Sequence, residues 1–258
     1  MKIVAVANQK GGVGKTTTSV NLAACLAAMG KGVLLVDLDP QGNATMSSGV
    51  DKDSVEYSAY DLLIDQVPLN TVAVRGGENG FDVVASNRDV TAAEIELLSI
   101  TGRENRLKEA LATAFQYDFV IIDCPPSLSM LTVNALVAAN SVLITMQCEY
   151  FALEGLSALL DTIGRVTYTV NPGLRIEGIL RTMYDPRNSL TGEVSAQLHK
   201  HFENQVFRTV IPRNVRLAEA PSHGLAALHY DRYSAGARAY SALAGEFVKR
   251  QETSRIQG

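Results

Sequence analysis

The sequence predicts an α/β fold in which a doubly wound, mostly parallel sheet carries helices on both faces. An apolar run, Ile3–Ala7, leads into the glycine-rich segment Lys10–Thr17, and a helical pattern begins at Lys15. Further short apolar runs alternate with helical stretches along the chain, as expected for parallel strands joined by crossover helices. Aromatic residues make up only 6% of the chain, so aliphatic side chains fill the core, as buried parallel strands prefer.

The expected elements follow one another with short connections. Strands are expected over residues 3–7, 33–36, 81–85, 119–122, 142–146, 176–182 and 206–211. Helices are expected over residues 15–29, 91–99, 103–115, 131–139, 153–168, 191–202 and 235–250, with a short one near 60–64. The rest of 41–80 carries no clear pattern. We expect 1–250 to form a single domain and the polar residues 251–258 to be a frayed tail.

Composition narrows the class of protein. The chain has 258 residues, 47% of them hydrophobic, which is enough for one large core. Its net charge of −4 does not indicate a nucleic-acid binder. The two parts differ, however: residues 1–150 carry 10 Lys and Arg against 17 Asp and Glu, and residues 151–258 carry 13 against 10. The second part is therefore positive, although ordinary scatter explains such a difference equally well.

The cysteines and the hydropathy pattern indicate a cytoplasmic protein. Cys25, Cys124 and Cys148 are an odd number without paired spacing, so we expect buried small side chains and not a disulfide framework or a metal site. No signal peptide precedes the first strand, and no apolar run approaches the roughly 20 residues of a membrane span.

The segment Lys10–Thr17 predicts a phosphate-binding loop. A strand, a glycine loop and a helix in this order let backbone N–H groups surround a phosphate chain at the helix N-terminus. In such loops the lysine at position 15 reaches the β- and γ-phosphates, and the next hydroxyl, that of Thr16, ligates Mg²⁺. The expected nucleotide-binding residues of the loop are Lys10, Gly11, Gly12, Val13, Gly14, Lys15, Thr16 and Thr17.

The loop departs from the common pattern G-x-x-x-x-G-K-[ST] at its start. Gln9 stands at the position of the first glycine, and a second lysine, Lys10, follows it. A positive side chain at that position is not needed to hold the chain's own phosphates. From the residue alone, the alternative is a solvated surface charge.

Carboxylates follow two of the expected strands. Asp123 ends the strand 119–122, where the aspartate that holds Mg²⁺ usually lies, and Asp37 and Asp39 follow the strand 33–36. The carboxyl ends of parallel strands line the ligand crevice of such sheets. We therefore expect Asp123 and Asp37 near the metal and Asp39 orienting a water in line with the γ-phosphate. The alternative is that one of the pair only caps the turn before Pro40.

Five segments together carry a resemblance to a known family. They are K-G-G-V-G-K-T-T at 10–17, V-D-L-D-P-Q-G-N-A-T at 36–45, I-I-D-C-P-P-S-L at 121–128, C-E-Y-F-A-L-E-G-L at 148–156 and V-I-P-R-N-V-R-L-A-E-A-P-S-H-G at 210–224. The chain resembles the ParA/Soj chromosome-partitioning ATPases, within the larger MinD/ParA group of deviant Walker-A proteins. The resemblance extends from Met1 to about Phe247.

The resemblance implies a weak, Mg²⁺-dependent ATPase that works as an ATP-sandwich homodimer. Lys10 is similar to the signature lysine that reaches the partner subunit's phosphates, so that Lys10, Lys15 and Asp39 become the catalytic set. Gly11 and Gly12 are then close to the partner subunit. Pro212, Arg213 and Asn214 are implied to form the adenine pocket, with Met183 nearby; without the resemblance they read as a turn after a strand.

The resemblance also implies a DNA partner. ParA/Soj proteins bind DNA without sequence preference as ATP dimers, and Arg187 and Arg216 match positions that carry this binding in close relatives. Such binding needs only phosphate contacts. A ParB-like centromere-binding protein is implied to stimulate hydrolysis and so release the dimer. The expected location is the cytoplasm, on the nucleoid, with no membrane partner.

Three other functions compete with this interpretation. A MinD-like membrane switch ends in an amphipathic helix, but Gly245–Gly258 holds only Phe247, Val248 and Ile256 as larger apolar residues among many polar ones. An iron–sulfur ATPase needs cysteines that bridge a cluster across a dimer. A synthetase needs a substrate pocket, and the sequence contains no further cluster of catalytic side chains.

Overall fold

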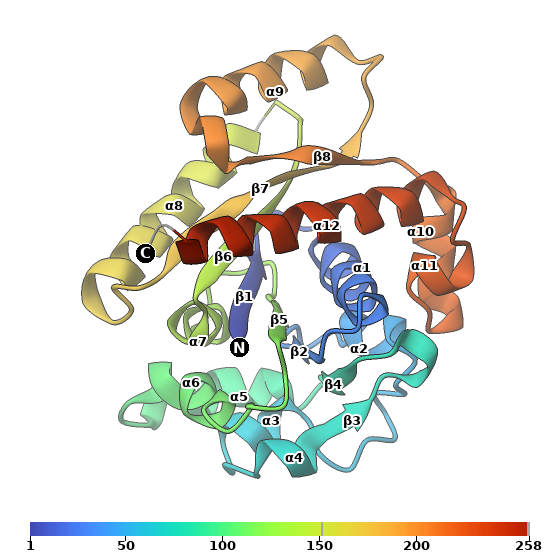
Figure 1. Cartoon of the computed structure of the whole chain (residues 1–258). Coiled ribbons are helices and arrows are strands. Elements are labelled where there is room, and N and C mark those ends of the chain that lie inside the picture. Colours follow the sequence, from blue (N-terminus) through green and yellow to red (C-terminus); the bar gives the residue numbers. More distant parts are fainter. Residues whose placement is uncertain (151, 257–258) are drawn as a thin grey trace.

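The computed structural model describes residues 1–150 and 152–256, without the side chains of 253–256. Its strands form one eight-stranded sheet in the order β3-β4-β2-β5-β1-β6-β7-β8 (Figure 1). All neighbours are parallel except β3, which runs antiparallel to β4. The strands are β1 (Lys2–Ala7), β2 (Val33–Asp37), β3 (Ala73–Arg75), β4 (Asp82–Val84), β5 (Phe119–Asp123), β6 (Ser141–Gln147), β7 (Arg175–Tyr184) and β8 (Val206–Pro212).

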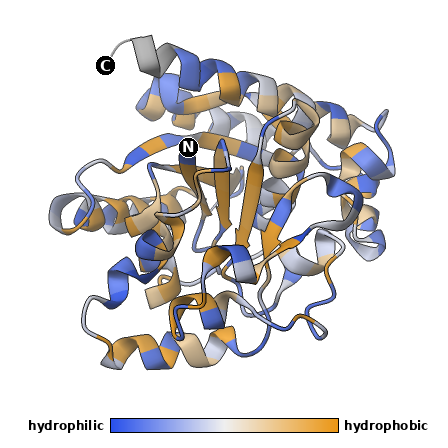
Figure 2. Ribbon diagram, turned by 60° about the horizontal axis from the view of Figure 1, so that its bottom comes forward, coloured by the Kyte–Doolittle hydropathy of each residue, from blue (hydrophilic) through white to orange (hydrophobic). Residues whose placement is uncertain are grey.

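Helices cover both faces of this sheet, as the sequence predicts. Successive strand residues point to opposite faces, so Val4 and Val6 pack with α1 and α12, whereas Ala5 packs with α7 and α8. Figure 2 shows the central strands as hydrophobic and much of the outer helical surface as hydrophilic. The helices are α1 (Lys15–Ala28), α2 (Asn43–Ser47), α3 (Ala59–Leu63), α4 (Leu69–Val72), α5 (Val90–Glu96), α6 (Arg106–Leu111), α7 (Met130–Ala138), α8 (Ala152–Thr169), α9 (Ser189–Phe202), α10 (Val215–Glu219), α11 (Ala227–Tyr230) and α12 (Ala235–Ile256).

The structure corrects several expected boundaries. The helix expected over 103–115 is a 3-10 turn followed by the short α6, and the one expected over 91–99 is α5 followed by a 3-10 turn. The edge strand β3 and the short helices α2, α4, α10 and α11 were not expected. Helix α12 continues to Ile256, beyond its expected end at 250, and 257–258 lie outside the described residues. The frayed tail expected at 251–258 stays a prediction.

The strand register brings the predicted aspartates together. β5 lies between β1 and β2, and in this register Asp37 of β2 stands opposite Asp123 of β5. Asp123 also stands opposite Val6, close to the point where β1 ends and the glycine loop begins. Because these strands are parallel, their carboxyl ends form one edge, and the loop and both aspartates lie along it.

Strands β7 and β8 approach each other closely at a glycine. A Cβ added to Gly178 would lie 2.6 Å from the Phe207 ring and 2.7 Å from the backbone oxygen of Gln205. One neighbour is backbone and the other a fully buried ring, so neither has room to move. The position therefore requires glycine.

We expect Gly178→Ala to lower the free energy of unfolding by about 1–3 kcal/mol, because an extra methyl group overpacks a dense core. Gly164→Ala is the matched control. Gly164 is an exposed residue inside α8 with open space around its Cα, so alanine there should stabilise by up to about 1 kcal/mol. Urea denaturation of both variants measures the difference, and equal effects would contradict the close contact.

Candidate functional site

The glycine loop is fixed from three neighbouring strands. At the end of β1, the Asn8 side-chain amide donates to the backbone oxygen of Thr145 in β6 at 2.6 Å, and its oxygen accepts from the Lys10 N–H at 3.0 Å. On the other side, the Thr182 hydroxyl of β7 donates to the backbone oxygen of Val13 at 2.8 Å. The loop is therefore held in shape by side chains that the sequence analysis did not single out.

Two glycines give the loop its turn into α1. Gly12 has φ +73° and Gly14 has φ +81°, the left-handed region that residues with a Cβ rarely adopt. Gly14 is the N-cap of α1, and it leaves the N–H groups of the first turn without side-chain partners. An anion at this helix start would meet those groups and the positive end of the helix dipole.

Lys15 lies inside the loop and is 7% exposed. Its Nζ donates to the backbone oxygen of Lys10 at 3.2 Å, and none of the ion pairs found in the described part of the chain includes it. Burial lowers the pKa of this lysine, while the nearby charge of Asp123 opposes the shift. A buried ammonium group without an ion-pair partner is suited to a phosphate ligand.

Asp123 is fully buried beside the first turns of α1. The Thr16 hydroxyl donates to one carboxylate oxygen at 2.8 Å and the Ser19 hydroxyl to the other at 2.7 Å. Burial raises the pKa of Asp123, and the two hydroxyl donors partly offset that shift. A hydroxyl and a carboxylate are hard oxygen donors at one place, which fits Mg²⁺ completed by water and phosphate oxygens.

Asp37 organises the turn after β2. One of its carboxylate oxygens accepts from both the N–H and the hydroxyl of Thr45, each at 2.8 Å, and the other accepts from the Asp39 N–H at 3.1 Å. Asp39 is less buried, and its carboxylate accepts from the Gln41 N–H at 3.0 Å. Both aspartates thus cap this turn, so the expected metal role of Asp37 and water-orienting role of Asp39 stay predictions.

The residues assigned to the adenine line one cavity next to the loop. Its volume is about 360 Å³, and Met183, Pro212, Arg213 and Asn214 line it together with Gly14 and Thr17. Met183 has φ +48°, an uncommon backbone conformation for a side chain of this size. The structure therefore brings this distant set together beside the phosphate loop, and its binding role stays a prediction.

Lys10 is placed quite differently from Lys15. Its side chain is 43% exposed, and its Nζ pairs with Glu149 at 2.6 Å. Glu149 follows β6 and belongs to the segment 148–156 that carried part of the resemblance, which is the signal by which the sequence could have indicated it. Exposed ion pairs contribute little stability, so Lys10 can leave Glu149 at small cost.

Comparisons with known proteins agree with this site. A family model described as an AAA domain matches residues 1–176. The sporulation initiation inhibitor protein Soj of Bacillus subtilis is 53% identical over 246 residues, which cover 95% of this chain and 97% of that protein. The chromosome partitioning protein ParA of Caulobacter vibrioides is 47% identical over 254 residues, covering 97% of this chain and 95% of that protein. The chain belongs to the ParA/Soj family of chromosome-partitioning ATPases.

A solved structure shares the whole fold. It is that of cobyrinic acid a,c-diamide synthase from Mycobacterium smegmatis with bound ATP analogue and magnesium. It matches with a TM-score of 0.86 and 38% identity, and the match covers 98% of this chain and 97% of that one. A ParA/Soj chain and a protein named as a synthase thus have one fold in common, and the fold by itself does not decide the activity.

The two arginines assigned to DNA are both paired with acids. Arg187 is 88% exposed and forms a two-pronged contact with Asp185, at 2.9 Å and 2.7 Å. Arg216 pairs with Glu219 at 2.7 Å and with Asp231 at 3.4 Å. These pairs reduce the local positive charge, but surface pairs are weak enough to open toward a phosphate. The DNA role of both residues stays a prediction.

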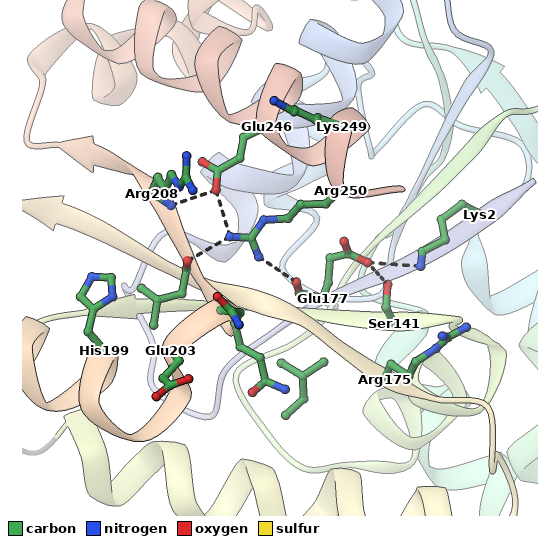
Figure 3. A pocket seen from close by; sticks show the side chains of 14 residues that line it. Lys2, Ser141, Arg175, Glu177, His199, Glu203, Arg208, Glu246, Lys249 and Arg250 are labelled. Atoms are coloured by element: carbon green, nitrogen blue, oxygen red, sulfur yellow. Dashed lines mark hydrogen bonds and ion pairs between the residues drawn. The ribbon is translucent and has the colours of Figure 1, made fainter. Parts of the chain in front are cut away.

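A second cavity, larger than the one beside the loop, lies where β1, β6 and β7 begin (Figure 3). Its volume is about 770 Å³, and four of its charged side chains pair with one another. Glu177 accepts from Lys2 at 3.2 Å and from Ser141 at 2.6 Å, and Glu246 pairs with Arg250 at 2.9 Å. This cavity is therefore separate from the nucleotide site.

The remaining sequence expectations concern the cysteines and membranes. Cys25, Cys124 and Cys148 are free and buried, as expected. Burial raises the pKa of the Cys25 and Cys148 thiols to about 11 each, so they stay protonated at neutral pH. Within the described residues, no helix is both long and apolar enough to cross a membrane.

We expect the facing carboxylates to make the nucleotide-free protein less stable as the pH rises. Burial, and for Asp37 also the charge of Asp123, raises both pKa values. The folded state then binds more protons than the unfolded state above about pH 4, so stability from this pair falls from pH 5 to pH 8. Asp37→Asn should reduce that fall, whereas the exposed control Asp53→Asn should not. Urea denaturation at pH 5 and pH 8 measures the free energy of unfolding. An identical fall with pH for all three proteins would contradict this prediction.

Proposed function

We propose that this ParA/Soj chain is a weak, Mg²⁺-dependent ATPase whose ATP-bound homodimer binds DNA non-specifically and partitions a chromosome or plasmid. One observation carries the proposal: the loop holds two lysines with opposite placements. Lys15 is buried against its own phosphate site, whereas Lys10 is exposed and held only by Glu149. A loop lysine whose side chain stays exposed supports a contact with the phosphates of a second subunit.

The proposed division of labour follows from this placement. Lys15 and the loop N–H groups bind the chain's own phosphates. Thr16 and Asp123 would hold Mg²⁺, which supplies charge neutralisation on the phosphates. Asp39 would orient the attacking water. Lys10 adds positive charge at the partner's phosphates only in the dimer, as arginine fingers do in related systems, so hydrolysis would depend on assembly.

The DNA step would depend on the same assembly. Each subunit offers a few phosphate contacts, Arg187 and Arg216 among them, and a twofold dimer doubles their number. A monomer would then bind poorly and the ATP dimer usefully. A ParB-like centromere-binding protein would stimulate hydrolysis and return the subunits to monomers. The relative named as a chromosome partitioning protein supports the partitioning role, and the partner and the location on the nucleoid follow from the family resemblance.

The competing functions have less support. In a MinD-like switch the apolar side of the last helix must reach lipid, but Phe247 of α12 is fully buried and Val248 packs on the same core. A synthase would need a second substrate site. In the second cavity, Lys2 pairs with Glu177 and Glu246 pairs with Arg250. Identities of 47–53% favour the Soj and ParA relatives over the synthase at 38%.

We expect the purified protein to bind double-stranded DNA with ATP and Mg²⁺, but not with ADP or without nucleotide. Fluorescence anisotropy on two unrelated duplexes should give equal affinities. Arg216→Ala should weaken both equally and make the log–log salt dependence shallower by about one unit for each phosphate that it leaves unneutralised. The exposed Arg88→Ala serves as the charge-matched control. Equal DNA affinity with ATP, with ADP and without nucleotide would contradict the switch. An unchanged slope of the salt dependence in Arg216→Ala would refute the Arg216 contact.

We expect Lys10→Ala to bind ATP within about twofold of the wild type, because Lys15 and the loop amides remain. Its DNA- and partner-stimulated ATP hydrolysis should fall by at least about tenfold, because the variant supplies no positive charge at the transferring phosphate. Lys31→Ala, a change at an exposed lysine on the connection between α1 and β2, is the control. Full stimulated turnover in Lys10→Ala would remove the role assigned to this lysine.

A further inference from the structure

Strand β8 does not follow β7 in a regular ladder. From Ile179 to Arg181, β7 advances two residues, while the paired residues of β8 run from Val206 to Val210, an advance of four. A second, opposite shift follows, because β7 advances three residues from Arg181 to Tyr184 while β8 advances two from Val210 to Pro212. Over the whole stretch β8 therefore gains one residue on β7, and the backbone groups that lie outside regular strand pairing need other partners. The stretch ends at Pro212–Asn214, the side of the cavity assigned to adenine.

Arg181 supplies partners for the carbonyl groups of this stretch. Its Nη2 donates to the backbone oxygen of Phe207 at 2.9 Å and to that of Arg208 at 3.3 Å. Its Nη1 donates to the Ser195 hydroxyl of α9 at 2.8 Å, and its guanidinium lies 5.6 Å from the centre of the Tyr184 ring. One rigid guanidinium thus joins β7, β8 and α9.

Glu246 of α12 supplies partners for the N–H groups of the same stretch. Its carboxylate accepts from the Arg208 N–H at 2.9 Å (Figure 3). It also accepts from the Thr209 N–H at 2.9 Å and from the Thr209 hydroxyl at 2.8 Å. Although burial opposes it, these donors lower the pKa of Glu246. A cation therefore holds the carbonyl side of the irregular stretch and an anion holds its amide side.

The burial of Arg181 is costly, and stability alone does not explain it. The residue is 7% exposed, its Nε has no hydrogen-bond partner, and no ion pair of the described residues includes it. A buried charge held only by neutral oxygens is an expensive way to join two strands. Two positions along β7, Met183 adopts its left-handed conformation and lines the cavity.

We propose that Arg181 is a positioning residue for nucleobase recognition. By holding the irregular stretch of β8, Arg181 fixes the register of β8 against β7 at Pro212. It thereby places Pro212–Asn214 against Met183. The inference rests on the proposed function, because it takes that cavity as the adenine pocket. The phosphate loop is anchored through the side chains of Asn8 and Thr182. Thr182 follows Arg181 on β7 and also lines the cavity, but the three acceptors of the Arg181 guanidinium lie on β8 and α9 and not on the loop. Arg181 therefore governs affinity for the base more than affinity for the phosphates.

The experiment measures the binding of ADP, GDP and pyrophosphate by calorimetry with Mg²⁺, using the full chain. Arg181→Lys keeps the charge but cannot bridge three acceptors with one planar group. We expect it to weaken ADP by about tenfold and to change GDP and pyrophosphate by less than about twofold, so that the preference for ADP over GDP falls. A merely structural role would weaken all three ligands alike or lower only the melting temperature.

Ser195→Ala keeps the proposal testable if Arg181→Lys does not fold. It removes one anchor of the guanidinium, and the preference for ADP should fall by at least about twofold. Gln197→Ala, an exposed change on the same helix, is the control and should leave the preference unchanged. Folded variants that keep the wild-type preference for ADP would overturn the role of Arg181 but not the adenine pocket. A wild-type protein that binds ADP no better than GDP would overturn the adenine pocket and this inference together.

Discussion

The site depends on one buried carboxylate. Asp123 ends the central strand β5, and both of its oxygens accept hydroxyl hydrogen bonds from α1, through Thr16 and Ser19. An ionised carboxylate in such a place must be paired or hydrogen-bonded, or it takes up a proton. These contacts therefore bind the loop, the first helix and the middle of the sheet into one unit. A divalent cation bound at Asp123 would replace these hydrogen bonds to the carboxylate with stronger electrostatic interactions.

Without a nucleotide, the site contains buried charged groups that are not paired with groups of opposite charge among the described residues. Asp37 and Asp123 face each other across β2 and β5, and the buried Lys15 has no ion-pair partner among the described residues. Two buried acids favour a bound cation, and one buried ammonium group favours a bound phosphate. Mg²⁺ and a nucleotide would satisfy both needs together. Lys10 differs because its charge is exposed and is held only by a weak surface pair with Glu149 among the described residues. It could therefore exchange Glu149 for a group of a second subunit.

The base cavity is built by a different principle. The phosphate loop is a local structure, formed within a few residues of chain. The cavity instead needs Met183 of β7 and Pro212–Asn214, which follow an irregular stretch of β8, to arrive side by side. Charged side chains from β7 and α12 hold that stretch where strand pairing does not. The loop and the cavity thus depend on largely different side chains, although Thr182 contributes to both, since it bonds to Val13 and lines the cavity.

Local sequence patterns were enough to predict the fold class, most of the strands and the loop Lys10–Thr17, because these depend on short-range periodicity and on glycines at set positions. They also indicated Asp37, Asp39 and Asp123, because each lies at the end of a strand. They did not indicate the partners Ser19, Thr45 and Thr182, because a hydroxyl that bonds to a carboxylate or to a loop carbonyl group has no sequence pattern of its own. Glu149 lies in the segment 148–156 that carried part of the resemblance, but its contact with Lys10 was not expected. Nor did they predict that α12 extends to Ile256 or that α6 is as short as Arg106–Leu111.

Which of these residues meet became known only from the three-dimensional arrangement. Asp37 caps a turn through Thr45, the arginines assigned to DNA are paired with acids, and Arg181 bridges an irregular strand pair. The contacts of Asp37 and of the two surface arginines are mostly local in the chain, but the hydrogen bonds of Arg181 reach residues 14 to 27 positions away, and their geometry follows from strand order and register. Periodicity within one segment carries no information about register between segments, which is why the sequence could identify the parts of the site but not their connections.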